Sequence, residues 1–349
     1  MSTEIEIVGR KIGAGHPCFI IAEAGVNHNG DINLAKKLIE VAADAGADAV
    51  KFQLYSLKEQ VCRVAPTANY QKKLTGATSM LEMGMSYDLP WTAHLELVKH
   101  CNQVGIEYMA SCFDPSAVDF LSELGCDCIK VGSGEITNYP LLAHMAATGK
   151  PILLSTGMST LEDVAGAVEH IHSYGSSPLA LFQCISNYPA DPATINLRAM
   201  QALAAAFHVP VGYSDHTVGS TVAVAALALG ASIIEKHFTL EKTLPGPDHA
   251  MSLNPIELRE FIGELRAAEA SFGDGIKRPD PSELNTLTAA RRSLVSTHLI
   301  TKGTRLADAD VTLKRPATGI DPRLWEFARG RTVSSDIPED VPITWEMLV

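Results

Sequence analysis

Two lysines and two histidines in this 349-residue sequence follow short apolar runs. If each run is a buried strand, these residues stand at the carboxyl ends of the strands. Lys51 and Lys130 close the runs DAVK and CIK, and two such ammonium groups would bind a phosphate or a phosphate–carboxylate dianion. His216 and His237 close two later runs, in SDHT and EKHF. Imidazoles at neighbouring strand ends can share one Mn²⁺ or Mg²⁺ and leave positions for water and substrate.

Both pairs also have a second interpretation. Two hydrogen-bonded histidines can simply fill a core, and one strand-end lysine can form a Schiff base, as in aldolases. The position of both histidines at strand ends favours a metal. Two lysines on separated strands favour anion binding.

Carboxylates and hydroxyls accompany these groups. Glu23, in IAEAG, and Glu135, in GSGE, are the carboxylates best placed for proton transfer or water activation. The sequence offers Glu23 no local partner, whereas a structural salt bridge with a nearby lysine is an equal alternative for Glu135. Ser111, Ser133 and Ser155 would add hydroxyls and backbone N–H groups beside helix N-termini.

Eight strand-like runs alternate with segments of helical periodicity and must position these residues. Such alternation predicts parallel strands with right-handed crossovers, either in a doubly wound open sheet or in a (β/α)₈ TIM barrel. Because every run ends in a polar or charged group, all ends should face one shared rim, which favours the barrel. The expected strands are 18–24, 48–53, 107–112, 127–132, 152–155, 179–184, 210–214 and 232–237.

The chain should contain two domains. We expect the catalytic barrel over residues 1–280, a linker rich in proline and charge over 281–293, and a small β-rich domain over 294–349. The connection over residues 56–90 is long and rich in methionine towards its end, which is typical of a segment that covers a site.

Composition limits the function classes. The formal net charge of −12 argues against nucleic-acid binding, which needs a basic surface. Seven cysteines without paired spacing predict a reduced, cytoplasmic setting. The sequence shows no signal peptide, and no apolar run approaches the roughly 20 residues of a membrane helix.

Several ordered stretches resemble the sialic acid (N-acetylneuraminate) synthase family. The resemblance covers the barrel and continues into the tail, where one stretch looks like a loop of the antifreeze-like (SAF) domain. The stretches are IAEAGVNHNG (21–30), VKFQ (50–53), KVGSGE (130–135), CISNYP (184–189), GYSDHT (212–217), EKHF (235–238), GPDH (246–249) and LKRPATGI (313–320).

The resemblance implies a synthase that condenses phosphoenolpyruvate with open-chain N-acetylmannosamine, giving a nine-carbon 2-keto sugar acid and phosphate by C–O cleavage. Alternative acceptors in the family are N-acetylmannosamine 6-phosphate and the diacetamido-trideoxy hexoses that lead to legionaminic and pseudaminic acids. Ser186 stands where some bacterial members carry Asn, which places the chain outside that group and leaves the sugar open.

The resemblance also assigns roles to residues. His216 and His237 would hold the divalent metal that polarises the aldehyde, and Glu23 would help water attack C2. Tyr188, Asp248 and Arg315 would bind the sugar, with Arg315 reaching across a domain-swapped homodimer from the small domain. The phosphoenolpyruvate ligands would be Lys51, Gln53, Ser111, Lys130, Ser133, Ser155, Ser186 and Ser214.

Three rival functions remain at this point. One is another phosphoenolpyruvate-dependent aldol-type synthase acting on a phosphorylated aldose, and another is a metal-independent Schiff-base aldolase. The third is a carbohydrate- or ice-binding protein built on the tail, which would leave the polar rim of the barrel without a use.

Overall fold

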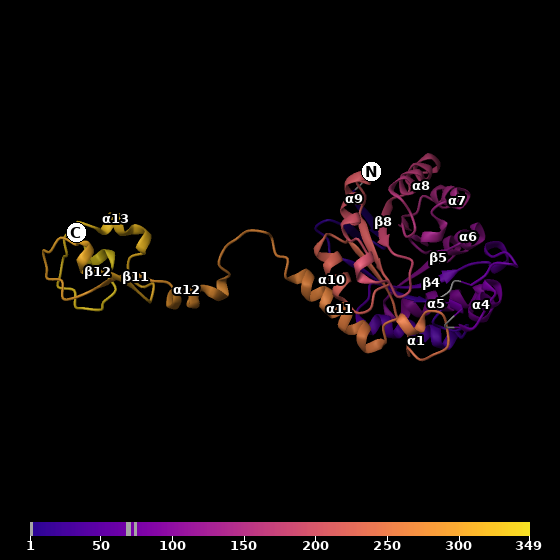
Figure 1. Cartoon of the computed structure of the whole chain (residues 1–349), viewed down its shortest axis with the longest axis horizontal. Helices are drawn as coiled ribbons and strands as arrows, with labels where there is room; N and C mark the ends of the chain where they lie inside the picture. Colours follow the sequence, from indigo (N-terminus) through magenta and orange to yellow (C-terminus); the bar gives the residue numbers. More distant parts are fainter. Residues whose placement is uncertain (1–2, 68–70, 73–74) are drawn as a thin grey trace. The chain divides into compact units, whose positions relative to one another are not determined.

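The chain divides into two compact units, Met1–Phe272 and Gly273–Val349. The structure, a computed structural model, describes residues 3–67, 71–72 and 75–349. The first unit contains the predicted strand–helix repeats, and the second contains the β-rich tail (Figure 1).

Eight parallel strands of the first unit form a closed barrel, in which the last strand, β10, pairs with the first, β3. The closed ring confirms the predicted TIM barrel and excludes the open sheet. Alternating apolar residues explain the closure, because one set fills the interior while the other packs under the helices. The strands are β3 (Phe19–Gly25), β4 (Ala49–Leu54), β5 (Glu107–Cys112), β6 (Ile129–Val131), β7 (Ile152–Ser155), β8 (Leu179–Cys184), β9 (Val211–Asp215) and β10 (Ile233–His237).

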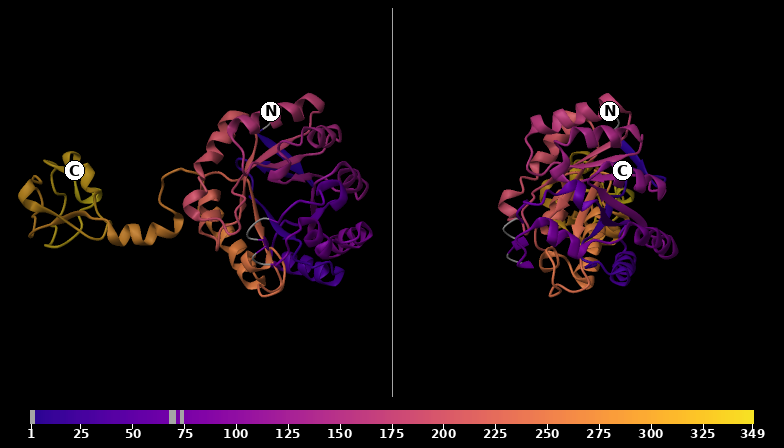
Figure 2. Two further views of the ribbon diagram at one scale, coloured as in Figure 1. Left: turned by 45° about the vertical axis from the view of Figure 1, so that its right-hand side comes forward. Right: turned by 90° about the vertical axis from the view of Figure 1, so that its right-hand side faces the viewer.

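Helices surround the barrel on its outer face (Figures 1 and 2). Their ends follow the capping residues in the sequence: Asp31 caps α1, Asn254 caps α11, and Gly46 ends α1 with φ of 86°. None of the described helices is long and apolar enough to cross a bilayer. The surrounding helices are α1 (Ile32–Ala45), α5 (Trp91–Val104), α6 (Pro115–Glu123), α7 (Tyr139–Ala147), α8 (Leu161–Tyr174), α9 (Arg198–Phe207), α10 (Thr221–Ala228) and α11 (Pro255–Ala270).

A two-stranded antiparallel hairpin precedes the barrel and was not anticipated from the sequence. It consists of β1 (Glu4–Ile7) and β2 (Arg10–Gly13), and its Ile5, Ile7 and Ile12 join the apolar cluster inside the barrel. This cluster leaves the carboxyl ends of the strands as the open, polar end.

The long connection between β4 and α5 is partly helical. It contains α2 (Leu57–Gln60) and α4 (Met80–Tyr87), where a loop over 56–90 was expected. Single-turn 3₁₀ helices in the other connections are η1 (Ser133–Glu135), η2 (Pro192–Thr194) and η3 (His249–Met251).

The second unit is a small β-rich domain with its own apolar core, in which Leu294, Ile300 and Val333 are buried. Its strands β11 (Ser293–Ser296) and β12 (Val311–Lys314) pair antiparallel. The predicted linker, residues 281–293, contains the helix α12. The remaining helices are η4 (Pro281–Glu283), α12 (Leu284–Ala290), η5 (Asp308–Asp310), η6 (Pro322–Leu324), α13 (Trp325–Ala328) and η7 (Trp345–Met347).

Gly212 provides a test of barrel packing. A Cβ at this position would lie 2.8 Å from the Ile233 carbonyl oxygen and 2.9 Å from Phe182. We expect Gly212→Ala to lower the free energy of unfolding of the barrel by about 1–3 kcal/mol, because neither neighbour can retreat in a packed interior.

The matched control is Gly263→Ala, on the exposed face of α11, where an added Cβ meets nothing within 4 Å. This variant should gain about 0.5–1 kcal/mol because alanine favours the helix. Urea unfolding followed by circular dichroism measures both. Equal effects of the two variants would contradict the packing argument.

Candidate functional site

Strand register brings the predicted site residues to one level at the carboxyl end of the barrel. His237 of β10 lies beside Glu23 of β3, and Glu23 lies beside Lys51 of β4. On the next strands Ser111 lies beside Lys130. Inward-pointing residues of neighbouring strands therefore converge, although they are far apart in the sequence.

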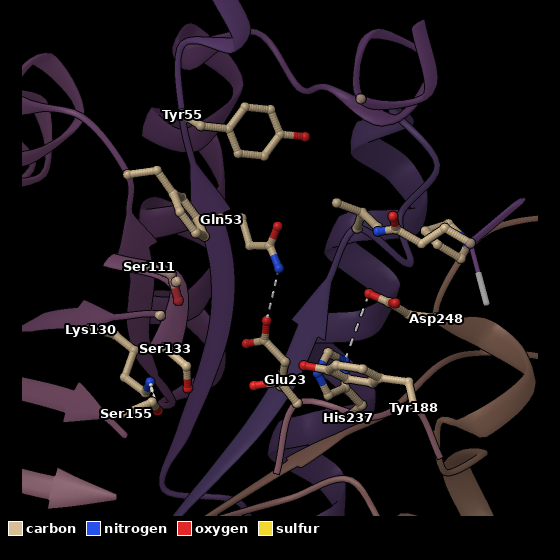
Figure 3. A pocket seen from close by; sticks show the side chains of 18 of the residues that line it. Glu23, Gln53, Tyr55, Ser111, Lys130, Ser133, Ser155, Tyr188, His237 and Asp248 are labelled. Atoms are coloured by element: carbon tan, nitrogen blue, oxygen red, sulfur yellow. Dashed lines mark hydrogen bonds and ion pairs between the residues drawn. The ribbon is translucent and has the colours of Figure 1, made fainter. Parts of the chain in front are cut away.

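These residues line a cavity of about 300 Å³. Figure 3 shows Ser111, Lys130 and Ser155 on one side of it, Tyr188 and His237 on the other, and Glu23 between the two sides. Of the residues singled out from the sequence, the lining includes Glu23, Lys51, Gln53, Ser111, Lys130, Ser133, Ser155, Ser186, Tyr188, Ser214, His216, His237 and Asp248.

Four buried charged groups form the floor of this cavity. The Lys51 ammonium lies 2.6 Å from a Glu23 carboxylate oxygen and 3.7 Å from Glu235, and it donates a hydrogen bond to Ser111 at 2.8 Å. Lys130 lies 4.0 Å from Glu235. The sequence offers Glu23 no local partner, and its partner in the structure comes instead from the neighbouring strand.

Glu235 is a site residue that the sequence reasoning missed. It accepts a hydrogen bond from the Ser214 hydroxyl at 3.0 Å, and its second oxygen, Oε2, is buried without a hydrogen-bond partner among the described residues. The sequence alone could have indicated this residue, because Glu235 stands two residues before His237 in the same strand and must point to the same inward face.

Hydroxyl groups surround the Lys130 side of the cavity. Lys130 donates to the Ser155 hydroxyl at 2.6 Å, and the Gly157 N–H donates to the Ser133 hydroxyl at 3.0 Å. A Cβ at Gly157 would come within 2.5 Å of the Ser186 hydroxyl and 2.8 Å of that of Ser133. The absence of a side chain at this glycine lets the backbone approach both hydroxyls, an arrangement suited to an anion.

Burial and charge shift the pKa values of the floor residues in opposite directions. Burial raises the pKa of Glu23 to about 7, even though Lys51 opposes the shift. The pKa of Glu235 falls to about 2 despite burial, because Lys130 and Lys51 both favour its charged form. Burial lowers the pKa of Lys130. Glu23 is thus the carboxyl group that can exchange a proton near neutral pH.

His216 and His237 lie together with their ring centroids 5.5 Å apart. Burial lowers the pKa of both, so both imidazoles are neutral, as metal ligands must be. His216 Nδ1 bonds the Ile185 carbonyl at 2.6 Å, whereas His237 Nδ1 is buried and has no hydrogen-bond partner within the described part of the chain. Among the described residues, no group of three or more His, Cys, Asp or Glu could hold a metal ion.

Tyr188 and Asp248 complete the histidine side of the cavity. The Tyr188 ring lies 3.9 Å from the His216 ring, centroid to centroid, and an Asp248 oxygen lies 4.0 Å from His237 Nδ1. Gly25 makes this crowding possible, because it has φ of 53° and a Cβ there would lie 3.3 Å from Glu23 and 3.5 Å from Asp248.

An apolar wall faces the polar floor. It comes from the β4–α5 connection, which was expected to cover the site. Among the described residues of this connection that line the cavity, none is a lysine or an arginine. We call it the α2–α4 wall; its apolar members are Leu57, Val61, Met80 and Met83, and it also contains Gln60, Gln71 and Tyr87, whose side chains carry polar groups.

Two predicted residues are not part of this lining. Glu135 ends η1 and accepts a hydrogen bond from the Asn138 amide at 2.8 Å. Arg315 belongs to the second unit and is exposed.

Comparison with known proteins connects this site to a family. The sequence model of the NeuB family matches residues 38–277, and that of the SAF domain matches residues 291–349. The chain is 42% identical over 339 residues to the N,N'-diacetyllegionaminic acid synthase of Legionella pneumophila, covering 96% of this chain and 95% of that protein. It is 45% identical to the enzyme of the same name from Campylobacter jejuni, over 92% and 97% of the two chains.

A solved structure agrees with these matches. The N-acetylneuraminic acid (sialic acid) synthetase of Leptospira borgpetersenii, crystallised with citrate, is 35% identical with a TM-score of 0.72. The match covers 82% of this chain and 96% of that chain. Together with the closed barrel, these findings confirm the predicted fold class.

The buried carboxyl group of Asp248 predicts a pH-dependent stability. Burial raises its pKa from 3.8 to about 6, so the folded protein holds this proton more tightly than the unfolded chain. The wild type should therefore lose stability relative to Asp248→Asn as pH rises from about 4 to 6, by up to about 3 kcal/mol. Above pH 6 the difference should level off.

Urea unfolding of both proteins at pH 4, 6 and 8 in metal-free buffer measures this difference. A gap between the two proteins that does not change with pH would show that Asp248 is not held in its neutral form by burial.

Proposed function

Because this chain belongs to the NeuB family of sialic acid synthases and is a phosphoenolpyruvate-dependent transferase that forms a carbon–carbon bond, we propose that it makes a nine-carbon 2-keto sugar acid from a diacetamido-trideoxy hexose. The product would be a legionaminic acid. The observation that carries this choice is the apolar α2–α4 wall opposite a polar floor.

The wall suits the methyl groups of such an acceptor. A diacetamido-trideoxy hexose carries a methyl group at C6 and a second acetyl group where N-acetylmannosamine carries hydroxyls. Burying these groups against Met80, Met83 and Tyr87 would be favourable, whereas a hydroxyl there would lose its hydrogen bonds to water. Two relatives that align along nearly the whole chain bear the name N,N'-diacetyllegionaminic acid synthase, which supports the same acceptor.

N-acetylmannosamine is the second candidate acceptor. The Leptospira relative named N-acetylneuraminic acid synthetase supports it. N-acetylmannosamine 6-phosphate is disfavoured. The described residues of the α2–α4 wall include no lysine or arginine that lines the cavity and could neutralise the phosphate group of this sugar.

Phosphoenolpyruvate would lie over the lysine side of the floor. Lys51 and Lys130 would neutralise its phosphate and carboxylate. The hydroxyl groups near Gly157 would donate hydrogen bonds to the phosphate oxygens. The full proposed set is Lys51, Gln53, Ser111, Lys130, Ser133, Ser155, Ser186 and Ser214.

His216 and His237 would hold Mn²⁺ or Mg²⁺ beside the acceptor. When bound, the cation supplies a Lewis acid that polarises the aldehyde oxygen, which a weak enol-phosphate nucleophile requires. Tyr188 and Asp248 lie next to these imidazoles and would orient the sugar so that its aldehyde carbon faces C3 of phosphoenolpyruvate.

Glu23 would handle the proton in the second half of the reaction. After C3 bonds to the aldehyde carbon, water adds to C2 and the C2–O bond breaks, releasing phosphate with its bridging oxygen. Glu23 lies between the lysine and histidine sides of the cavity, and its pKa of about 7 lets it take a proton from that water. Glu135 has no place in this proposal.

We also propose a homodimer in which Arg315 of one protomer reaches the sugar in the partner's barrel. The resemblance of residues 313–320 to the SAF-domain loop supports this arrangement.

Phosphate release from phosphoenolpyruvate tests the reaction and the acceptor together. We expect release only with an acylated amino sugar and added Mn²⁺, with a kcat/KM about tenfold or more higher for the diacetamido-trideoxy hexose than for N-acetylmannosamine. N-acetylmannosamine 6-phosphate should be the poorest acceptor. No release with any of the three sugars would refute the proposed function.

Mixing two inactive variants tests the dimer. Glu23→Ala impairs the barrel and Arg315→Ala impairs the tail, but a hybrid dimer contains one barrel and one tail that are both intact. An equal mixture, unfolded and refolded together, should recover about a quarter of wild-type activity if subunits pair at random. If no activity is recovered although mass spectrometry demonstrates hybrid dimers, each tail serves its own barrel.

A further inference from the structure

A second buried ion pair lies behind the two histidines, outside the cavity. Asp215 and Lys236 are 1% and 2% exposed, and the carboxylate Oδ2 lies 2.7 Å from the ammonium nitrogen. Neither residue lines the cavity, and the Lys236 ammonium lies 5.6 Å from the centre of the Phe261 ring of α11. The pair therefore occupies the layer between barrel and helices, where many of the buried side chains are apolar.

Strand alternation places this pair directly behind the site. Asp215 precedes His216 and Lys236 precedes His237, so an outward charged residue alternates with an inward imidazole on both β9 and β10. The register of the two strands pairs Lys236 with Asp215. The ion pair thus joins the two strands at the level where they present the histidines.

The same pair fixes the backbone on both sides of His216. The Asp215 Oδ1 accepts hydrogen bonds from the Thr217 N–H at 2.8 Å, the Thr217 hydroxyl at 2.7 Å and the Tyr213 hydroxyl at 3.0 Å. Lys236 also donates to the Thr217 carbonyl. Since β9 ends at Asp215, these bonds replace the strand ladder that His216 lacks.

Stability alone does not account for a buried ion pair at this position. Removing two charges from water is costly, and well-packed apolar residues of similar volume are often equally stable or better. Apolar replacements would, however, lose the bonds that Asp215 and Lys236 make to Thr217. What the pair supplies beyond packing is a fixed geometry.

We propose that Asp215 and Lys236 are positioning residues that hold His216 and His237 at the separation needed to share one divalent cation. This inference rests on the proposed metal site. The inference goes beyond the proposed metal site, because it assigns the alignment of the two histidines to a charged pair that would contact neither substrate nor metal.

Binding of Mn²⁺ alone to the full-length protein tests the inference without turnover. Free Mn²⁺ is measured by electron paramagnetic resonance for the wild type, Lys236→Met and the double variant Asp215→Leu/Lys236→Met. We expect both variants to bind Mn²⁺ about 10–100-fold more weakly. The double variant should unfold at a higher temperature than Lys236→Met, because it leaves no unpaired buried charge, although the three donors to Asp215 lose their acceptor.

Two further variants separate positioning from folding. Asp48→Asn breaks an ion pair with Arg266 that involves the start of β4, at the opposite end of the barrel, and should lower the unfolding temperature without changing the Mn²⁺ affinity. Thr217→Val removes only one hydroxyl donor to Asp215, so it should fold and still weaken Mn²⁺ binding several-fold.

The outcomes distinguish this inference from the proposed function. Wild-type Mn²⁺ affinity in Thr217→Val and the double variant would overturn the positioning role while leaving the metal site intact. Failure of the wild type to bind Mn²⁺, or unchanged binding in His216→Ala, would overturn the metal site and this inference with it.

Discussion

Mutual neutralisation of two lysines and two glutamates, all buried, is the interaction on which the site depends. Lys51 and Lys130 alternate in space with Glu23 and Glu235, and each charge would be costly to bury without its neighbours. The four side chains come from four different strands, so only a closed barrel in correct register brings them together. The fold and the charge array therefore require each other, and a phosphoenolpyruvate-sized anion would enter a floor whose cations are already in place.

The floor divides the reaction between two sides. The lysine side, with hydroxyls near Gly157, suits a phosphate, while the histidine side presents two neutral imidazoles beside Asp248. Glu23 lies where the sides meet and has the pKa closest to neutrality among the floor carboxyl groups. Burial and the neighbouring Glu235 charge raise the pKa of Glu23, whereas Lys130 and Lys51 lower that of Glu235, so two similar side chains differ in charge state.

The sequence predicted the barrel and most of the cavity lining, because apolar runs that end in polar residues are a local signal. It could not predict contacts between strands. The partner of Glu23 is Lys51 on the next strand, and only the register of β9 and β10 pairs Asp215 with Lys236. Glu135 follows a glycine-rich stretch that resembles an anion loop, but a 3₁₀ turn directs it to Asn138. Glu235, by contrast, could have been found from alternation alone.

The α2–α4 wall and the floor differ in which parts of the chain supply their residues. The floor draws its four charged residues from four different barrel strands, so a change there disturbs charges that balance one another. The wall comes from one connection between β4 and α5, contributes no charged pair to the floor, and can be exchanged as a single stretch of chain. If this wall selects the acceptor, as proposed, acceptor choice can diverge by replacement of one segment of chain while the floor stays unchanged.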